Sequence, residues 1–183
     1  MKKLLLTLIL PLIVLSSVSY GEELNGLFGI TLYDNAEKYV SSNYIDSNKY
    51  KNSETIEGYF DLIVTDKIKT KSPYANVYLV AVDNDNIIHR IYGEQDFINL
   101  DICQAVRKDL LSDVEEKYQI DLKYKEKSFP SFKRYHNYYW TSSGNYLGMQ
   151  CKERYSDSTI VFQIYMLTAV LDKAIDEFYD AGI

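Results

Sequence analysis

The sequence has few of the residues on which metal and thiol chemistry depends. Its 183 residues include two cysteines, Cys103 and Cys151, and two histidines, His89 and His136. Zinc sites draw on cysteine and histidine at short, regular spacings, and neither histidine stands at such a spacing from another ligand. The sequence therefore predicts no metal site and no cofactor.

Catalytic motifs are missing as well. The chain contains no Gly-x-Ser-x-Gly elbow, no His-Glu-x-x-His, no phosphate loop, no Cys-x-x-Cys and no Gly-x-Gly-x-x-Gly. The two carboxylates that hydrolyse glycosides are close in space but not at a fixed spacing in sequence, so no pair can be chosen from among the 26 acidic residues. We therefore expect a protein that is not an enzyme, and we predict no catalytic residue.

No apolar run is long enough to span a bilayer. The longest, Leu4–Leu15, follows two lysines and precedes small residues. A membrane-spanning helix needs about 20 apolar residues, whereas this layout is typical of a secretory signal peptide. We predict a signal peptide at residues 1–21, cleaved after Ser19 or Gly21, and no stable membrane insertion afterwards.

Basic residues are outnumbered by acidic ones, 20 to 26, which gives a net charge of −6. Loss of the signal peptide removes Lys2 and Lys3, so the balance becomes 18 to 26 and the net charge −8. Nucleic-acid binding needs a basic surface, so nucleic acid is not an expected partner. The short leader and the lack of an anchor favour a bacterial periplasm, with the extracellular space as the second choice.

An exported chain meets an oxidising compartment, where a pair of cysteines forms a disulfide by default. We therefore predict a bond between Cys103 and Cys151. Thiol catalysis is not expected, because it would need a free cysteine in that compartment.

Aromatic and β-branched residues alternate with a period of two in several segments, which is typical of half-buried strands. They predict strands at residues 59–65, 76–82, 87–92, 138–142, 146–155 and 159–167. Between two of these lies Asp83-Asn84-Asp85-Asn86. An EF-hand would need a ligand and a glycine where Ile87 and Ile88 stand, so the segment is predicted as a hairpin turn.

Helix signals flank these strands. An acidic cap at Asp101 predicts a helix over 102–118, with Arg107 on its solvent face, and Thr168 predicts a closing helix over 169–179. A short helix is expected to begin at Asp34. Residues 43–57 and 119–137 are predicted to be polar connections.

Helices and hairpins are therefore grouped, which indicates an α+β fold with one or more antiparallel sheets packed by helices and a C-terminal helix. Residues 22–183 are expected to form one domain. A helix followed by three strands occurs twice, so halves at about 30–95 and 100–167 are one interpretation. A single continuous sheet covered by helices is the other.

Basic and aromatic residues concentrate between Lys123 and Trp140. Aromatic and arginine side chains are enriched where partners bind. We interpret the segment as a candidate binding surface for an acidic or glycan partner, with His136 exposed; its residues are Lys133, Arg134, Tyr135, His136 and Trp140. The alternative is a solvated loop that leads into a core strand.

The segment FGITLYDNAEKYV, residues 28–40, precedes antiparallel strands, and the order of helix and strands then recurs. This organisation resembles the β-lactamase inhibitor proteins and the related small outer-membrane lipoprotein modules. The resemblance covers the order of elements over most of the mature chain and implies protein binding by fold analogy. The chain lacks the lipid-attachment cysteine of the lipoprotein members, and no functional residue is carried over.

We therefore expect an exported, non-catalytic protein that binds another envelope protein. An inhibitor of a secreted hydrolase and a small cell-wall hydrolase are the alternatives.

Overall fold

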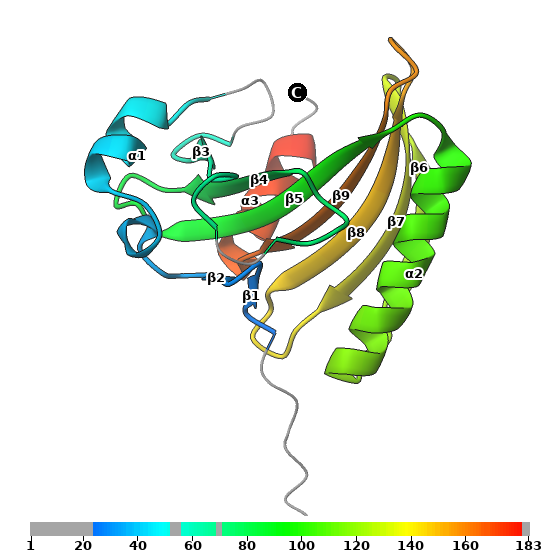
Figure 1. Cartoon of the computed structure of the whole chain (residues 1–183), viewed down its shortest axis with the longest axis horizontal. Coiled ribbons are helices and arrows are strands. Elements are labelled where there is room, and N and C mark those ends of the chain that lie inside the picture. The colour runs from blue at the N-terminus through cyan, green and yellow to red at the C-terminus, as the bar shows by residue number, and fades with distance from the viewer. Residues whose placement is uncertain (1–23, 52–55, 69–70, 181–183) are drawn as a thin grey trace, which may run out of the picture.

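The computed structural model describes residues 24–51, 56–68 and 71–180. The predicted signal peptide lies outside these residues. The described part contains a seven-stranded antiparallel sheet, a two-stranded hairpin and three α-helices (Figure 1). The predicted α+β class, antiparallel sheet and C-terminal helix are confirmed.

The elements follow one another along the chain as β1 (Gly26–Leu27), β2 (Ile30–Thr31), the 3-10 helix η1 (Ala36–Lys38), α1 (Ser42–Asn48), β3 (Phe60–Ile63), β4 (Val77–Val82), β5 (Ile88–Phe97), α2 (Leu100–Tyr118), β6 (Lys123–Ser128), β7 (Phe132–Trp140), β8 (Tyr146–Arg154), β9 (Ile160–Leu167) and α3 (Ala169–Asp180). The strand order in the large sheet is β3-β4-β5-β9-β8-β7-β6. The strands of each predicted half are therefore neighbours, and β5 and β9 join the two groups. The internal repeat stays a prediction.

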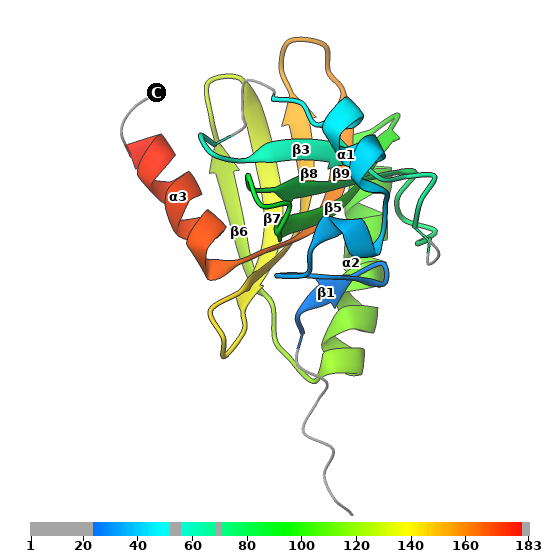
Figure 2. The same ribbon diagram turned by 90° about the vertical axis from the view of Figure 1, so that its left-hand side faces the viewer.

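The two long helices lie on opposite sides of the sheet (Figures 1 and 2). On one face, α2 packs over β8 and β9 and covers the main core, to which Leu147, Met149 and Phe162 belong. On the other face, Leu171 of α3 packs against Tyr146 and Leu167 in a much smaller cluster. Because α3 covers only one end of this second face, the rest of it is open.

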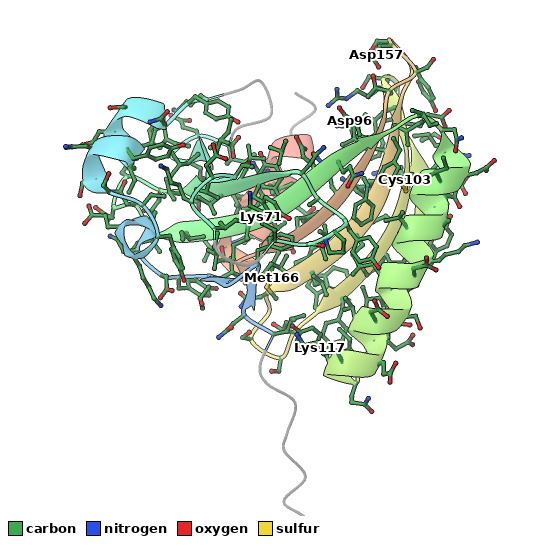
Figure 3. All side chains as sticks on the ribbon, in the orientation of Figure 1. Lys71, Asp96, Cys103, Lys117, Asp157 and Met166 are labelled. Atoms are coloured by element: carbon green, nitrogen blue, oxygen red, sulfur yellow. A yellow bond between two sulfur atoms is a disulfide. The ribbon has the colours of Figure 1, made fainter. Side chains whose placement is uncertain are left out.

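A disulfide joins Cys103 of α2 to Cys151 of β8, and both cysteines are fully buried. Figure 3 shows Cys103 on the side of α2 that meets the strands. Such a bond is compatible with an oxidising, exported environment. Within the described residues, no helix is long and apolar enough to cross a membrane.

The turn at Asp83–Asn86 is confirmed as a hairpin connection between β4 and β5. The Asp83 carboxylate accepts hydrogen bonds from the backbone N–H groups of Asp85 and Ile87, both at 2.9 Å. Asn86 adopts a positive φ of 64°, a conformation that asparagine tolerates. The Asp83 side chain thus stabilises the turn in which it lies.

The N-terminal helix prediction is wrong in position. The chain makes only one 3-10 turn after Asn35, because the Asp34 carboxylate is engaged by Lys38 and by the Tyr39 hydroxyl instead of capping a helix. The α-helix, α1, lies in the predicted loop, where Ser41 caps it. Ile45 is fully buried there, and one apolar residue in two turns is too weak a pattern to recognise.

Residues 119–137 are not a connection but contain most of a hairpin, β6–β7. Every residue of β6 is exposed, so this edge strand shows no alternation between polar and apolar residues. Backbone pairing with β7 defines it, and Pro130 lies in the turn. Polar edge strands of this kind carry little sequence signal.

Helix α2 is confirmed, but Asn99 caps it and Arg107 does not face solvent. Arg107 is 4% exposed and donates through Nη1 to the Asn137 side chain. Its guanidinium lies 5.1 Å from the centre of the Tyr124 ring. The Asn137 amide and the Tyr124 ring accommodate the buried guanidinium at a position where helical periodicity alone predicted exposure to solvent.

Candidate functional site

The structure divides the binding surface predicted from the sequence, because alternate residues of β7 face opposite sides of the sheet. Arg134, His136 and Trp140 face the open side and line a cleft. Lys133 and Tyr135 face the other way. Tyr135 joins the main core, and the Lys133 ammonium lies 2.6 Å from the Glu126 carboxylate.

The cleft lies over the open sheet face and has a volume of about 710 Å³. Its floor comes from β4, β5, β9, β8 and β7, while β6 and α3 border it. Its volume is within the range of sites that hold small molecules. We use "the cleft" below for this site.

One end of the cleft is strongly cationic. Five basic side chains from three neighbouring strands line it: Lys125, Lys127, Arg134, Lys152 and Arg154. Among the described residues, no carboxylate forms an ion pair with Lys125, Lys127, Arg134 or Arg154. Lys127 and Arg134 instead lie over the Phe129 ring, at 4.8 and 5.3 Å from its centre.

The opposite end carries acidic and aromatic groups. Trp140 donates its indole N–H to the Asp172 carboxylate of α3 at 3.3 Å. Burial raises the pKa of Asp172 above its usual value. Trp140 is the single tryptophan of the chain and remains 48% exposed, so it reports on occupancy of the cleft.

His136 is 3% exposed, not solvent-exposed as predicted. Its Nε2 lies 3.1 Å from the Tyr146 hydroxyl and 3.0 Å from the Tyr165 hydroxyl. Burial lowers the pKa of His136 to about 3, and nearby cations, Arg134 first, act in the same direction. Burial also raises the pKa of Tyr165 to about 12, so the imidazole and this phenol are both neutral near pH 7.

This depressed pKa predicts a pH dependence of stability. His136 titrates near pH 6.5 when the chain is unfolded and near pH 3 when it is folded, so between these values only the unfolded chain takes up the proton. Stability therefore falls as the pH drops through this window. Between pH 6.5 and 5 we expect a loss of about 1 to 2 kcal/mol from this group.

Urea unfolding of the natural protein and of His136→Gln, at both pH values, measures the effect. The glutamine keeps an acceptor for the two tyrosines but does not titrate. The loss between the two pH values should be smaller in the variant by that amount, and equal losses would show that His136 is not responsible.

A row of polar side chains crosses the cleft floor on β5, β9 and β8, where Glu94, Gln163 and Gln150 are cross-strand neighbours. Gln163 donates from Nε2 to the Glu94 carboxylate at 3.1 Å. Gln150 donates from Nε2 to Gln163 Oε1 at 2.5 Å. We call these three residues the amide row.

Outside the cleft, His89 connects Asp83 and Thr168. Its Nε2 lies 3.1 Å from the Asp83 carboxylate and its Nδ1 3.1 Å from the Thr168 hydroxyl. The order of groups is that of a catalytic triad. Thr168 is fully buried, however, and its hydroxyl accepts from the Leu171 backbone N–H at the start of α3. The hydroxyl is therefore engaged by both His89 and the first turn of α3, and the arrangement anchors α3 to the sheet.

Metal ligands do not gather in the part of the chain that the structure describes. No group of three or more histidine, cysteine, aspartate or glutamate side chains there is placed to hold an ion.

Sequence analysis missed most of the cleft floor, including the whole amide row and Tyr165. One signal was present in the strands. Gln150 lies between Met149 and Cys151, and Gln163 lies between two apolar residues. A polar side chain within an otherwise apolar strand indicates that the sheet face on which it lies is not fully covered by the core.

Comparison of the chain with family models, with curated proteins and with solved structures finds no match. The cleft is therefore interpreted from its own chemistry.

Proposed function

We propose that the protein is an exported, non-catalytic binding module that holds an anionic ligand in the cleft. The observation that carries the proposal is the cationic end, where Lys125, Lys127, Arg134 and Arg154 have no acidic partner among the described residues. The chain as a whole has a net charge of −6, so this cluster of cations has the opposite sign to the overall charge of the protein.

Uncompensated like charges in a cleft repel one another, and walls of low dielectric strengthen the field that they produce. An anionic group that enters the cleft relieves this repulsion. Arginine adds a planar fork of donors that suits carboxylate, sulfate or phosphate. The aromatic side chains at the other end offer apolar surface for the remainder of the ligand.

The partner predicted from the sequence, another envelope protein, remains a prediction, as do the periplasmic location, the resemblance to inhibitor-type modules and the two alternative functions. Each of them is compatible with a ligand that presents negative charge.

Trp140 fluorescence provides a direct test. The mature protein is titrated at low salt with oligogalacturonate, oligoaspartate and inorganic polyphosphate, and with a neutral oligosaccharide for comparison. At least one polyanion should bind and the neutral compound should not. Binding should weaken as salt is raised, because the Debye length is only about 10 Å at 0.1 M.

Matched variants locate the binding. The double variant Lys125→Gln/Lys127→Gln should lower the affinity for the polyanion about tenfold, which corresponds to about 1.4 kcal/mol of binding free energy. Lys108→Gln/Lys117→Gln removes the same charge from α2, on the other side of the sheet, and should leave affinity unchanged. If none of the three polyanions binds, or if both double variants behave alike, the proposal is wrong.

A further inference from the structure

The orientation of the amide row is set by its acidic end. A carboxylate only accepts hydrogen bonds, so Gln163 must direct its NH₂ group towards Glu94. Gln163 Oε1 then faces β8 and must accept from the NH₂ group of Gln150. The direction of every amide follows from chemistry, and Gln150 Oε1 is left as the end of the chain.

This terminal acceptor has no donor among the described residues, although it is buried. Gln150 lines the cleft and is 7% exposed. His136 lies directly across the β7–β8 pair, but its Nε2 is directed to the hydroxyls of Tyr146 and Tyr165. A buried acceptor without a donor is strongly unfavourable, so the floor is incomplete until something donates to it.

Among the residues that the structure describes, Arg134, next to Gln150, has an unpaired donor where Gln150 has an unpaired acceptor. Arg134 Nε is a buried donor that has no acceptor within the described part of the chain. Since Arg134 lies two residues along β7 from His136, it is the diagonal neighbour of Gln150. Diagonal neighbours on one sheet face are about 7–8 Å apart. A ligand that completes both residues therefore presents an anionic acceptor and a hydrogen-bond donor to neighbouring positions of the sheet face.

Aromatic rings line the cleft on the side of Gln150 away from Arg134. Trp140 makes edge contacts with Tyr138 and Tyr146, at centroid distances of 4.9 and 5.2 Å. All three line the cleft. Rings of this kind pack against the C–H face of a sugar while their polar atoms remain hydrogen-bonded.

The position over the sheet face separates a sugar from a peptide. The backbone groups of β7, β8 and β9 are used in cross-strand pairing, so a ligand above them meets only side chains. A peptide would leave much of its own backbone unpaired there. Sugar hydroxyls both donate and accept, which suits a floor of amides, a carboxylate and phenols.

We infer that the cleft binds an acidic oligosaccharide, whose carboxylate or sulfate groups meet Arg134 and the neighbouring lysines and whose hydroxyl donates to Gln150. This inference rests on the proposed function and specifies the ligand of the same site.

Calorimetric titration with three probes tests it: tetragalacturonate, its methyl ester, and tetra-aspartate of equal charge. Tetragalacturonate should bind at least tenfold more tightly than either of the others. If tetra-aspartate binds as well or better, the inference is wrong and the proposed function stands. If the methyl ester binds equally well, or no polyanion binds, the proposed function fails as well.

Two further measurements isolate the hydroxyl contact. Gln150→Met keeps the side-chain length but removes the amide, both its acceptor, which is unpaired among the described residues, and its donor to Gln163. It should weaken the binding of tetragalacturonate about tenfold while the binding of tetra-aspartate is unaffected. O-methylated tetragalacturonate, which keeps the carboxylates but lacks hydroxyl donors, should show a similar loss on the unaltered protein. That second probe keeps the test valid if the variant does not fold, and equal affinity for both sugars would exclude the contact.

Discussion

Replacing both Cys103 and Cys151 with alanine is expected to lower the free energy of unfolding by about 4 kcal/mol. The disulfide spans 48 positions of the sequence, so it removes a large amount of conformational freedom from the unfolded chain. It also joins α2 to the centre of the sheet, where both cysteines are fully buried. A domain of this size has a total stability of only about 5–15 kcal/mol, so a large share depends on this bond.

Urea titration of the oxidised protein, the reduced protein and the double variant measures the loss. The reduced protein and the variant should agree, because both lack the same constraint on the unfolded chain. A double variant within 1 kcal/mol of the oxidised protein would contradict the prediction.

Replacing Asp61 with alanine is expected to lower the free energy of unfolding by about 3 kcal/mol or more. Asp61 of β3 is fully buried, and its carboxylate lies 2.6 Å from Arg90 Nη2 of β5. The two side chains meet across Ala81 of β4, which is small enough to leave room between them. Removing the carboxylate leaves a largely buried guanidinium without its closest counter-charge, and desolvation makes that state unfavourable.

The matched control is a pair of equal length at the surface. Glu126 and Lys133 are also 2.6 Å apart, but the Glu126 carboxylate is exposed to solvent, whereas that of Asp61 is fully buried. Glu126→Gln should therefore leave the urea midpoint unchanged within error, since water screens an exposed pair. The loss of stability caused by Asp61→Asn should lie between those caused by Asp61→Ala and Glu126→Gln. Equal effects of Asp61→Ala and Glu126→Gln would show that burial does not decide the strength of this pair.

Much of the secondary structure could be predicted because its signals are local. Alternation of side chains identified the centres of β4, β8 and β9, and Thr168 marked the beginning of α3. The polar turn at Asp83–Asn86 followed from the residues that tolerate turn dihedrals. Each of these depends on neighbours within a few positions of the chain.

The failures have a common physical cause. Strand β6 is exposed on both faces and exists through pairing with β7, so its residues carry no alternating pattern. Arg107 is buried because Asn137 and Tyr124, from other elements, accommodate its charge. In both cases contact with another element of the fold decided the outcome, and not the pattern within the element itself.

The sequence by itself determined the fold class, most strands, the closing helix and the one available pairing of cysteines, because composition, periodicity and caps act over short distances. It also predicted a candidate binding surface, of which the structure places Arg134, His136 and Trp140 in the cleft and Lys133 and Tyr135 on the other side of the sheet. Only the tertiary structure decided the cleft. Glu94, Gln163, Gln150 and His136 come from four strands, and they form one row only when the register of β5, β9, β8 and β7 brings them side by side.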